Sequence, residues 1–230
     1  MELWRALADV VELLAPRRCA GCDGEMAGYE ARDAGLDAFC EACAPLLDRV
    51  QRAAGATDTH AAFLYGGPMA DAVRRLKYHG RSELGPALGA LLVPVALEVL
   101  AGRTDDSVSD DDLAQVDRVV PVPLHASRLG ARGYNQAALL ARPVARALGV
   151  PLDTASLLRA RPNPPQVGRT AEDRARQVLH AFTARSDLAG ARLLLVDDVL
   201  TTGATIRDAR RALMARGARS VLAVALAQTP

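Results

Sequence analysis

The chain has 230 residues, 50% of them hydrophobic, so it is long enough and apolar enough to form a packed core. Its formal net charge of +1 argues against a protein that holds nucleic acids or membranes by overall charge alone. No segment resembles a secretory signal, and the most apolar run, residues 87–101, is short and contains Pro94 and Glu98, so we expect a cytoplasmic protein without membrane insertion.

Charge is unevenly distributed along the sequence. Residues 104–117 contain six Asp, whereas residues 118–185 contain eleven Arg against three acidic residues. We interpret the acidic segment as a solvated loop. The basic segment suits an anionic ligand such as a nucleotide, a phosphorylated sugar or single-stranded DNA.

The four cysteines form two C-x-x-C pairs, which follow a predicted amphipathic helix at residues 1–15. Cysteines three residues apart can direct both thiolates at one tetrahedral ion, and two such pairs complete a shell with no open position. A structural zinc ion is therefore favoured over two disulfides, a redox pair or a 4Fe–4S cluster. We expect it to staple a segment with little core of its own; the alternative is a contact with DNA or protein. The expected ligands are Cys19, Cys22, Cys40 and Cys43.

Hydrophobic spacing predicts alternating helices and strands in the next part of the chain. Lys77, the only Lys of the sequence, lies in a basic run at the end of one predicted helix, where it either satisfies the helix dipole or contacts a ligand. The predicted elements are a linker helix at 44–60, a strand at 61–66, helices at 68–79 and 83–101, and a strand at 118–122.

A basic stretch follows this last strand. Arg128 and Arg132 flank a predicted Gly-rich turn, and Asn135 is expected to cap a helix that runs to Leu148. Pro143, inside this helical pattern, predicts a kink or break at the preceding residue. The remaining predictions before the most informative stretch are a polar, irregular segment at 161–170 and a helix at 171–180.

The most informative stretch is residues 192–205. Leu193–Val196 are apolar, as expected of a strand buried on both faces of a parallel sheet. Asp197 and Asp198 follow where such a strand would leave the sheet, and small residues that allow a tight turn come next. A helix and a second apolar strand at 220–227 complete a strand–loop–helix–strand unit, whose ligands bind at the carboxyl ends of the strands.

This stretch suits a phosphorylated sugar. The backbone amides of the loop and of the helix N-terminus behind it attract phosphate, and Thr hydroxyls add donors. Two carboxylates would repel phosphate, so they suit ribose hydroxyls or Mg²⁺. A Walker A loop would need a Lys, which the stretch lacks, and too few residues follow Asp198 for a receiver domain. The alternative is that this stretch has only a structural role, as a buried strand followed by a capped helix.

Residues 194–205, with the sequence LLVDDVLTTGAT, resemble the phosphoribosyl pyrophosphate (PRPP) motif of type I phosphoribosyltransferases. The resemblance implies that Asp197 and Asp198 hold the ribose hydroxyls and act in catalysis, and that the loop holds the 5′-phosphate. The implied phosphate-binding residues are Val199, Leu200, Thr201, Thr202, Gly203, Ala204 and Thr205. The implied contacts for pyrophosphate or DNA are Lys77, Arg128 and Arg132.

Further motifs narrow this resemblance to the ComF family of competence-related proteins. They cover residues 19–227 and depart from the family pattern at Gln177, where Asn is usual, and at Pro143. The motifs, in the order of the family, are the cysteine pairs, KYHGR at 77–81, PVPL at 121–124, RGYNQ at 132–136, Gln166, Arg174 and the PRPP motif.

The resemblance implies an α/β fold of the type I phosphoribosyltransferase kind, a parallel sheet flanked by helices, with a small N-terminal zinc ribbon held by four cysteines. The implied domains are residues 1–58, with the N-terminal helix and the ribbon, and residues 59–230. The implied ligands are PRPP or a related phosphorylated ribose with Mg²⁺. The implied role is in DNA uptake and natural transformation, with single-stranded DNA and DNA-uptake proteins as partners. The alternative is a non-catalytic competence factor that binds single-stranded DNA, although aromatic residues, on which bases stack, are only 3% of the chain.

Overall fold

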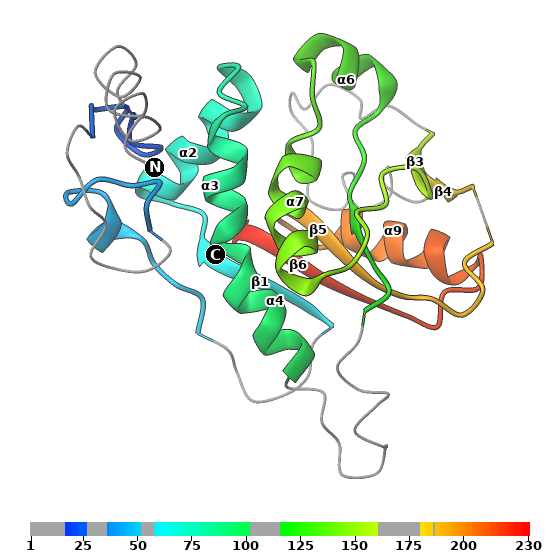
Figure 1. Ribbon diagram of the computed structural model, residues 1–230. Coiled ribbons are helices and arrows are strands. Elements are labelled where there is room, and N and C mark those ends of the chain that lie inside the picture. The colour runs from blue at the N-terminus through cyan, green and yellow to red at the C-terminus, as the bar shows by residue number, and fades with distance from the viewer. Residues whose placement is uncertain (1–16, 27–35, 52–57, 102–115, 161–179, 186) are drawn as a thin grey trace, which may run out of the picture.

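Four parallel strands form the central sheet, with helices on both faces (Figure 1). The computed structural model describes residues 17–26, 36–51, 58–101, 116–160, 180–185 and 187–230. The strands of the sheet are β1 (Thr59–Leu64), β2 (Arg118–Pro121), β5 (Arg192–Leu200) and β6 (Ser220–Gln228). Their order is β1-β6-β5-β2, and all three pairings are parallel. The carboxyl ends therefore lie at one edge of the sheet, and the predicted parallel α/β architecture is confirmed.

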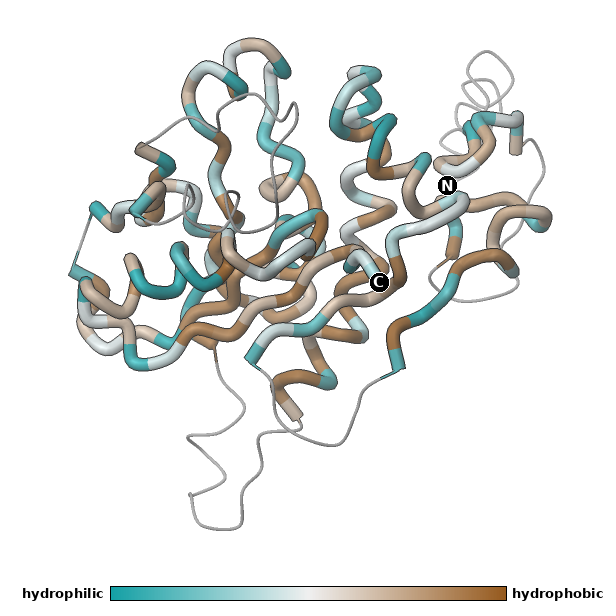
Figure 2. The backbone as a smooth tube through the Cα atoms, turned by 180° about the vertical axis from the view of Figure 1, so that it is seen from behind, coloured by the Kyte–Doolittle hydropathy of each residue, from teal (hydrophilic) through white to brown (hydrophobic). Residues whose placement is uncertain are grey.

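The two inner strands, β5 and β6, are buried on both faces. Successive side chains of a strand point to opposite faces, so Leu193 and Leu195 lie in one hydrophobic cluster while Leu194 and Val196 lie in the other. Hydrophobic residues accordingly run along most of the central strands (Figure 2). One face is covered by α2 (Gly67–Tyr78), α3 (Leu84–Ala90), α4 (Leu92–Ala101) and α7 (Gln136–Leu148), and the other by α9 (Ala204–Met214).

Helices α3 and α7 approach each other closely because α3 has glycines on the contacting side. A Cβ atom at Gly89 would lie 2.5 Å from the carbonyl oxygen of Leu140, so the α7 backbone occupies the space that a side chain would need. Pro143 lies inside α7, which runs without interruption, and the predicted break at this residue is wrong. Proline removes one helical hydrogen bond, and the buried α7 face that includes Leu140 and Val144 holds the helix together.

Residues 84–101 are long and apolar enough to cross a membrane by length and composition alone, with a mean hydropathy of 2.0 over 18 residues. The sequence-based statement that this run is too short is therefore corrected. Half of the segment is buried within the protein, where Leu88, Leu92 and Val99 pack in the core over the sheet. It is divided at Leu91 into α3 and α4, and it covers the sheet as predicted.

The predicted linker helix at 44–60 is wrong where the structure describes it. Only Ala44–Leu46 form a short 3-10 helix, η1, and the chain then runs extended beside β1. The amide of Val50 donates to the Ala62 carbonyl at 3.0 Å, and the amide of Leu64 donates to the Asp48 carbonyl at 2.8 Å. This segment pairs with the outer edge of β1, so tertiary hydrogen bonding overrides the local helical pattern.

The cysteine-containing segment shares its core with the rest of the chain. Cys19, Phe39 and Cys43 belong to the same hydrophobic cluster as Met69 and Leu76 of α2. The division of the chain at residue 58 remains a prediction. Outside the described residues lie the predicted helix at 1–15, residues 104–115 of the predicted acidic loop, the irregular segment at 161–170 and nearly all of the helix predicted at 171–180.

A two-stranded antiparallel sheet, which the sequence did not predict, lies beside α9. Its strands are β3 (Leu157–Arg159) and β4 (Phe182–Ala184). The buried carboxylate of Asp208 on α9 accepts hydrogen bonds from the amides of His180 at 2.9 Å and Phe182 at 3.0 Å. This carboxylate fixes the small sheet against the helix that follows the predicted PRPP motif.

Candidate functional site

Asp197 and Asp198 lie within β5 at the carboxyl edge of the sheet. The strand was expected to end before them, but its ladder with β6 continues through Leu200, which pairs with Gln228. The extra pairing keeps both carboxylates in the sheet, where Asp197 is 7% exposed and Asp198 is 4% exposed. Both nevertheless line a cavity, so they do not point into a sealed interior.

This cavity of about 180 Å³, the smaller cavity, collects many of the predicted site residues from distant parts of the chain. Of the residues predicted for phosphate binding, Val199 and Thr205 line it. The intervening residues do not: Leu200 is a buried strand residue, Thr201 and Thr202 are exposed, and Gly203 and Ala204 are half-buried where α9 begins. The lining residues are Lys77, Tyr78, Val122, Pro123, Leu124, Arg128, Arg132, Gln136, Arg159, Asp197, Asp198, Val199 and Thr205.

Lys77 and Asp198 form an ion pair across the cavity wall, with 2.6 Å between Nζ and Oδ1. The side chains are 19% and 6% exposed, so the pair is largely removed from water. The second carboxylate oxygen of Asp198, Oδ2, is buried and has no hydrogen-bond partner among the described residues. A buried carboxylate oxygen usually has a partner, so this atom is a candidate acceptor for a ligand hydroxyl or a ligand for a metal ion.

The environment shifts the protonation of this group of charges. Burial and the neighbouring Asp198 charge raise the pKa of Asp197 to about 7, although the Asp198 amide donates to its Oδ1 at 2.8 Å and lowers it somewhat. Burial lowers the pKa of Lys77, but the charge of Asp198 and the hydrogen bond to it outweigh burial and raise the pKa overall. At neutral pH, Lys77 is therefore charged and Asp197 is near its midpoint.

The basic side of the site is a helix and not the predicted Gly-rich turn. Helix α6 (Ala126–Arg132) begins at His125, whose Nδ1 accepts from the amide of Ser127 at 3.3 Å. Arg128 and Arg132 are one turn apart, so they share a face and both line the smaller cavity. Gly130 disfavours a helix, but the cap at His125 and the left-handed Gly133 at the other end still define one.

A larger cavity of about 420 Å³ adjoins the first and shares four of its lining residues. Tyr78 at its mouth is 71% exposed, and the guanidinium carbon of Arg132 lies 5.5 Å from the centre of its ring. The residues described as lining this cavity include three cations and no carboxylate. They are Lys77, Tyr78, Gly80, Arg128, Ala131 and Arg132.

The turn between β5 and α9 has features that suit an anion. Gly203 precedes the helix with a φ of 69°, a left-handed conformation that favours glycine. The first turn of α9 contains no acidic residue, so no carboxylate of that turn offsets its amides and the helix dipole. Thr201 and Thr202 are exposed, and Thr205 reaches the smaller cavity. Phosphate binding by this turn remains a prediction.

The four cysteines form a cluster whose geometry fits one tetrahedral ion. Their Sγ atoms all lie within 4.8 Å of one another, and those of Cys22 and Cys40 are 3.7 Å apart. Zinc–sulfur bonds of about 2.3 Å in a tetrahedron place sulfurs about 3.8 Å apart. The Cys40 amide donates to Cys19 Sγ at 3.3 Å, and the Gly24 amide donates to Cys22 Sγ at 3.4 Å, contacts that stabilise thiolate ligands. The described residues therefore fit a metal ion such as zinc.

Comparison with known proteins identifies the family of the chain. The model of the phosphoribosyl transferase domain family matches residues 135–230. The DNA utilization protein YhgH of Salmonella typhi is 35% identical over 72% of this chain and 69% of the relative. Competence protein F of Haemophilus influenzae is 30% identical over 70% of this chain and 68% of the relative. The chain belongs to the ComF family. Competence protein ComFC of Bacillus subtilis, 26% identical, covers 93% of this ComF-family chain and matches over 84% of its own length.

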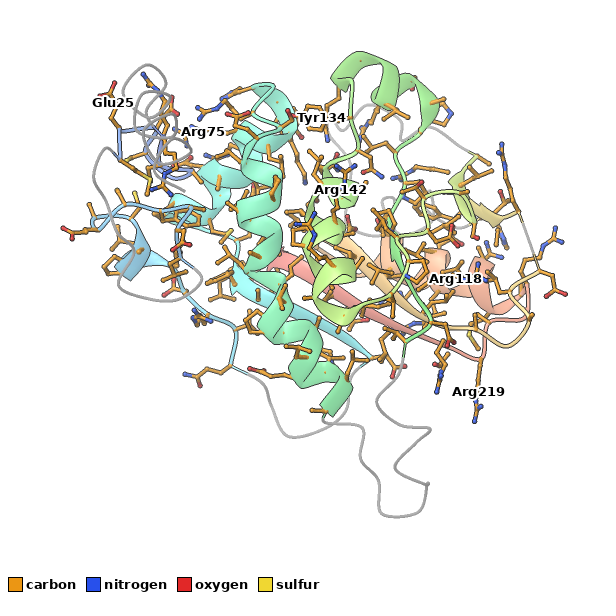
Figure 3. The ribbon with its side chains drawn as sticks, viewed as in Figure 1. Glu25, Arg75, Arg118, Tyr134, Arg142 and Arg219 are labelled. Carbon is orange, nitrogen blue, oxygen red and sulfur yellow. The ribbon has the colours of Figure 1, made fainter. Side chains whose placement is uncertain are left out.

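Two residues that line the smaller cavity of this ComF protein, Gln136 and Arg159, escaped prediction from the sequence. Tyr134 lines neither cavity but donates from Oη to the Leu76 carbonyl at 2.6 Å (Figure 3). Gln136 and Tyr134 lie in the RGYNQ motif that carried the resemblance, so the motif contained a signal for both. Arg159 lies on the unpredicted β3, and no local pattern marks it.

Proposed function

We propose that this ComF-family protein binds PRPP, or a related phosphorylated ribose, together with Mg²⁺ in the smaller cavity. The observation that carries the proposal is the lining of that cavity. Two carboxylates from β5, two arginines from α6 and Thr205 at the start of α9 face one space at the carboxyl edge of the sheet. Ligands of open parallel sheets bind at this edge.

Each part of the ligand has a matching part of the cavity. Asp197 and Asp198 accept hydrogen bonds from the ribose hydroxyls, and the buried Oδ2 of Asp198 is available for this. The turn at residues 199–205 and the N-terminus of α9 hold the 5′-phosphate. Arg128 and Arg132 bind the pyrophosphate oxygens through paired N–H donors.

Carboxylate oxygens are the ligands that Mg²⁺ prefers, and Asp197 and Asp198 supply them. When bound, Mg²⁺ neutralises charge on the pyrophosphate. Displacement of pyrophosphate gives the ribose oxocarbenium character, which a nearby negative carboxylate stabilises. Asp197 and Asp198 are therefore the proposed catalytic residues.

The relatives named for DNA utilization and competence favour a role in DNA uptake. The larger cavity, with Tyr78 beside three cations, gives single-stranded DNA a second candidate site. A base can stack on an exposed tyrosine while arginines contact its phosphates. In this second function the protein binds DNA without turnover.

Titration calorimetry of PRPP with Mg²⁺ tests the main proposal. Asp198→Asn removes a charged acceptor, so we expect affinity to fall by about tenfold to a hundredfold. Glu98→Gln, an exposed change on α4 that lines neither cavity, is the matched control and should bind as the wild type does. Absence of PRPP binding by the wild-type protein would refute the proposal.

A titration with single-stranded DNA at two salt concentrations distinguishes the second function, DNA binding, from PRPP binding. Salt-sensitive DNA binding that Asp198→Asn leaves unchanged favours a DNA site independent of the sugar pocket. A screen of nucleobases for pyrophosphate release then distinguishes a transferase from a sensor.

A further inference from the structure

The first cysteine pair is packed against both ends of α2. A guanidinium N–H group of Arg75, on the last turns of α2, donates to the carbonyl of Ala20 at 2.9 Å and also to the carbonyl of Gly21. Ala20 and Gly21 are the two residues between Cys19 and Cys22. A Cβ atom at Gly21 would lie 2.8 Å from Cβ of Pro68, so the loop also touches the start of α2. The loop between these cysteines is therefore a docking surface for the helix.

A second contact ties the same loop to the chain just after α2. Asp23, which follows Cys22, forms an ion pair with the Nη1 group of Arg81. This pair lowers the pKa of Asp23. Arg81 is 23% exposed at its side chain, so the contact lies partly within the protein. Arg75 and Arg81 flank residues 76–80 in the sequence. Both contact residues within or next to the first cysteine pair.

Residues 76–80 include the cation of the proposed site. Leu76 is fully buried, and its carbonyl accepts from Tyr134 Oη at 2.6 Å. Lys77 is the next residue, and its Nζ lies 2.6 Å from Asp198 Oδ1. The end of α2 is thus held between the cysteine loop, the segment that joins α6 to α7, and β5. Arg75 lies near the first cysteine pair, and Tyr134 lies between α2 and α7 (Figure 3).

We propose that the metal-loaded cysteine cluster positions Lys77 for its contact with Asp198, with Arg75 and Arg81 as the positioning residues. The carbonyls that Arg75 binds belong to the two residues between Cys19 and Cys22, so an ion held by both cysteines would also fix the direction of those carbonyls. Loss of the ion frees the loop, the end of α2 loses its support, and Lys77 leaves the carboxylate. The consequence for ligand affinity rests on the proposed function, whereas the link between the cluster and Lys77 does not.

Lys77 is the only lysine in the sequence, so amine acetylation reports on a single side chain. Brief treatment of the folded, zinc-loaded protein with acetic anhydride, followed by peptide mass spectrometry, gives its rate of modification. The α-amino group of the expressed chain is the internal reference. Asp198→Asn, which removes the partner directly, defines the rate of a released Lys77.

We expect Arg75→Ala to raise the Lys77 acetylation rate by about tenfold, and removal of zinc by a chelator under reducing conditions to do the same. A factor of this size corresponds to the loss of a hydrogen bond to a charged group. Arg74→Ala is the matched control, because Arg74 is the adjacent residue of the same helix and its side chain pairs with Asp71 on the surface. It should leave the rate unchanged. Asp23→Asn tests the second contact if Arg75→Ala does not fold, and should also raise the rate.

A Lys77 rate that stays at the wild-type value after zinc removal, in Arg75→Ala and in Asp23→Asn overturns the proposal. PRPP titration of the same samples separates the two proposals. If Lys77 responds but the wild-type protein binds no PRPP, the positioning role stands and the proposed function fails. If PRPP binds and Lys77 does not respond, the proposed function stands and the positioning role fails.

Discussion

Replacing Asp197 by Asn should stabilise the protein at neutral and alkaline pH. Asn has nearly the same shape and retains an oxygen that can accept from the Asp198 amide, as Asp197 Oδ1 does at 2.8 Å. It cannot ionise. The substitution therefore removes the cost of burying a negative charge beside Asp198 while the hydrogen bond is kept.

The size of the effect follows from the pKa of Asp197, which is raised from 3.8 to about 7. A raised pKa means that the folded state binds the proton more tightly than the unfolded state does. The favourable contribution of Asp197 to the free energy of unfolding is fully present below about pH 4 and is lost as the pH rises through about 7. A difference of about three pH units corresponds to about 4 kcal/mol. The advantage of Asp197→Asn should therefore grow by about this amount between pH 4 and pH 8.

Urea unfolding of wild type and variant at a series of pH values measures this difference, because the other titrating groups cancel between the two proteins. Asp208→Asn is the matched control. Asp208 is equally buried, but amide hydrogen bonds and Arg211 outweigh burial and lower its pKa. The stabilising contribution of the ionised Asp208 is present above about pH 4 and is lost only at lower pH. The Asp208→Asn variant should therefore be less stable than the wild type throughout the range from pH 4 to pH 8.

The reasoning about Asp197 is refuted if the difference between Asp197→Asn and wild type does not change from pH 4 to pH 8. It is also refuted if the advantage of the variant grows toward acidic pH. Either result would mean that Asp197 is ionised in the folded protein, and that the neighbouring Lys77 compensates both carboxylates.

Three further predictions, one with a control variant, concern the packing and the cysteine cluster. Gly89→Ala should lower the free energy of unfolding by about 2 kcal/mol, because its Cβ would lie 2.5 Å from the Leu140 carbonyl oxygen. Gly130→Ala, also helical but with open space around the new Cβ, should not be destabilised in the same urea titration. Asn135→Ala should cost about 1–2 kcal/mol, since the α7 cap and the bond to the Val122 carbonyl are both lost; a neutral result would contradict this account. Chelating zinc should lower the melting temperature in scanning calorimetry, and zinc but not magnesium should restore it; an unchanged melting temperature would argue against a structural ion.

Much of the fold was predictable because its signals are local. The apolar run of β5, the cap at Asn135 and the glycine at 203 each act within a few residues, and each lies where the pattern placed it. The local signals failed where tertiary contacts were stronger. Pairing with β6 extended β5 beyond Asp198, and the edge of β1 drew residues 48–50 out of the predicted helix.

The site shows the same division. The acidic pair, the cysteine pairs and the basic residues were all identifiable as types suited to sugars, metals and phosphates. Their partners were not, since Lys77 meets Asp198 across 121 residues of sequence and Arg75 meets Ala20 across 55.

By itself, the sequence determined the strand–loop–helix unit, the spacing of the four cysteines and the chemical character of each candidate residue, because these depend on periods and spacings of a few residues. Only the tertiary structure decided which cation meets which carboxylate, that α6 is a helix facing the cavity, and that the cysteine loop supports α2. Those outcomes depend on how the helices pack on the sheet and on burial that strengthens some charge contacts and penalises others. No short stretch of the chain contains that information.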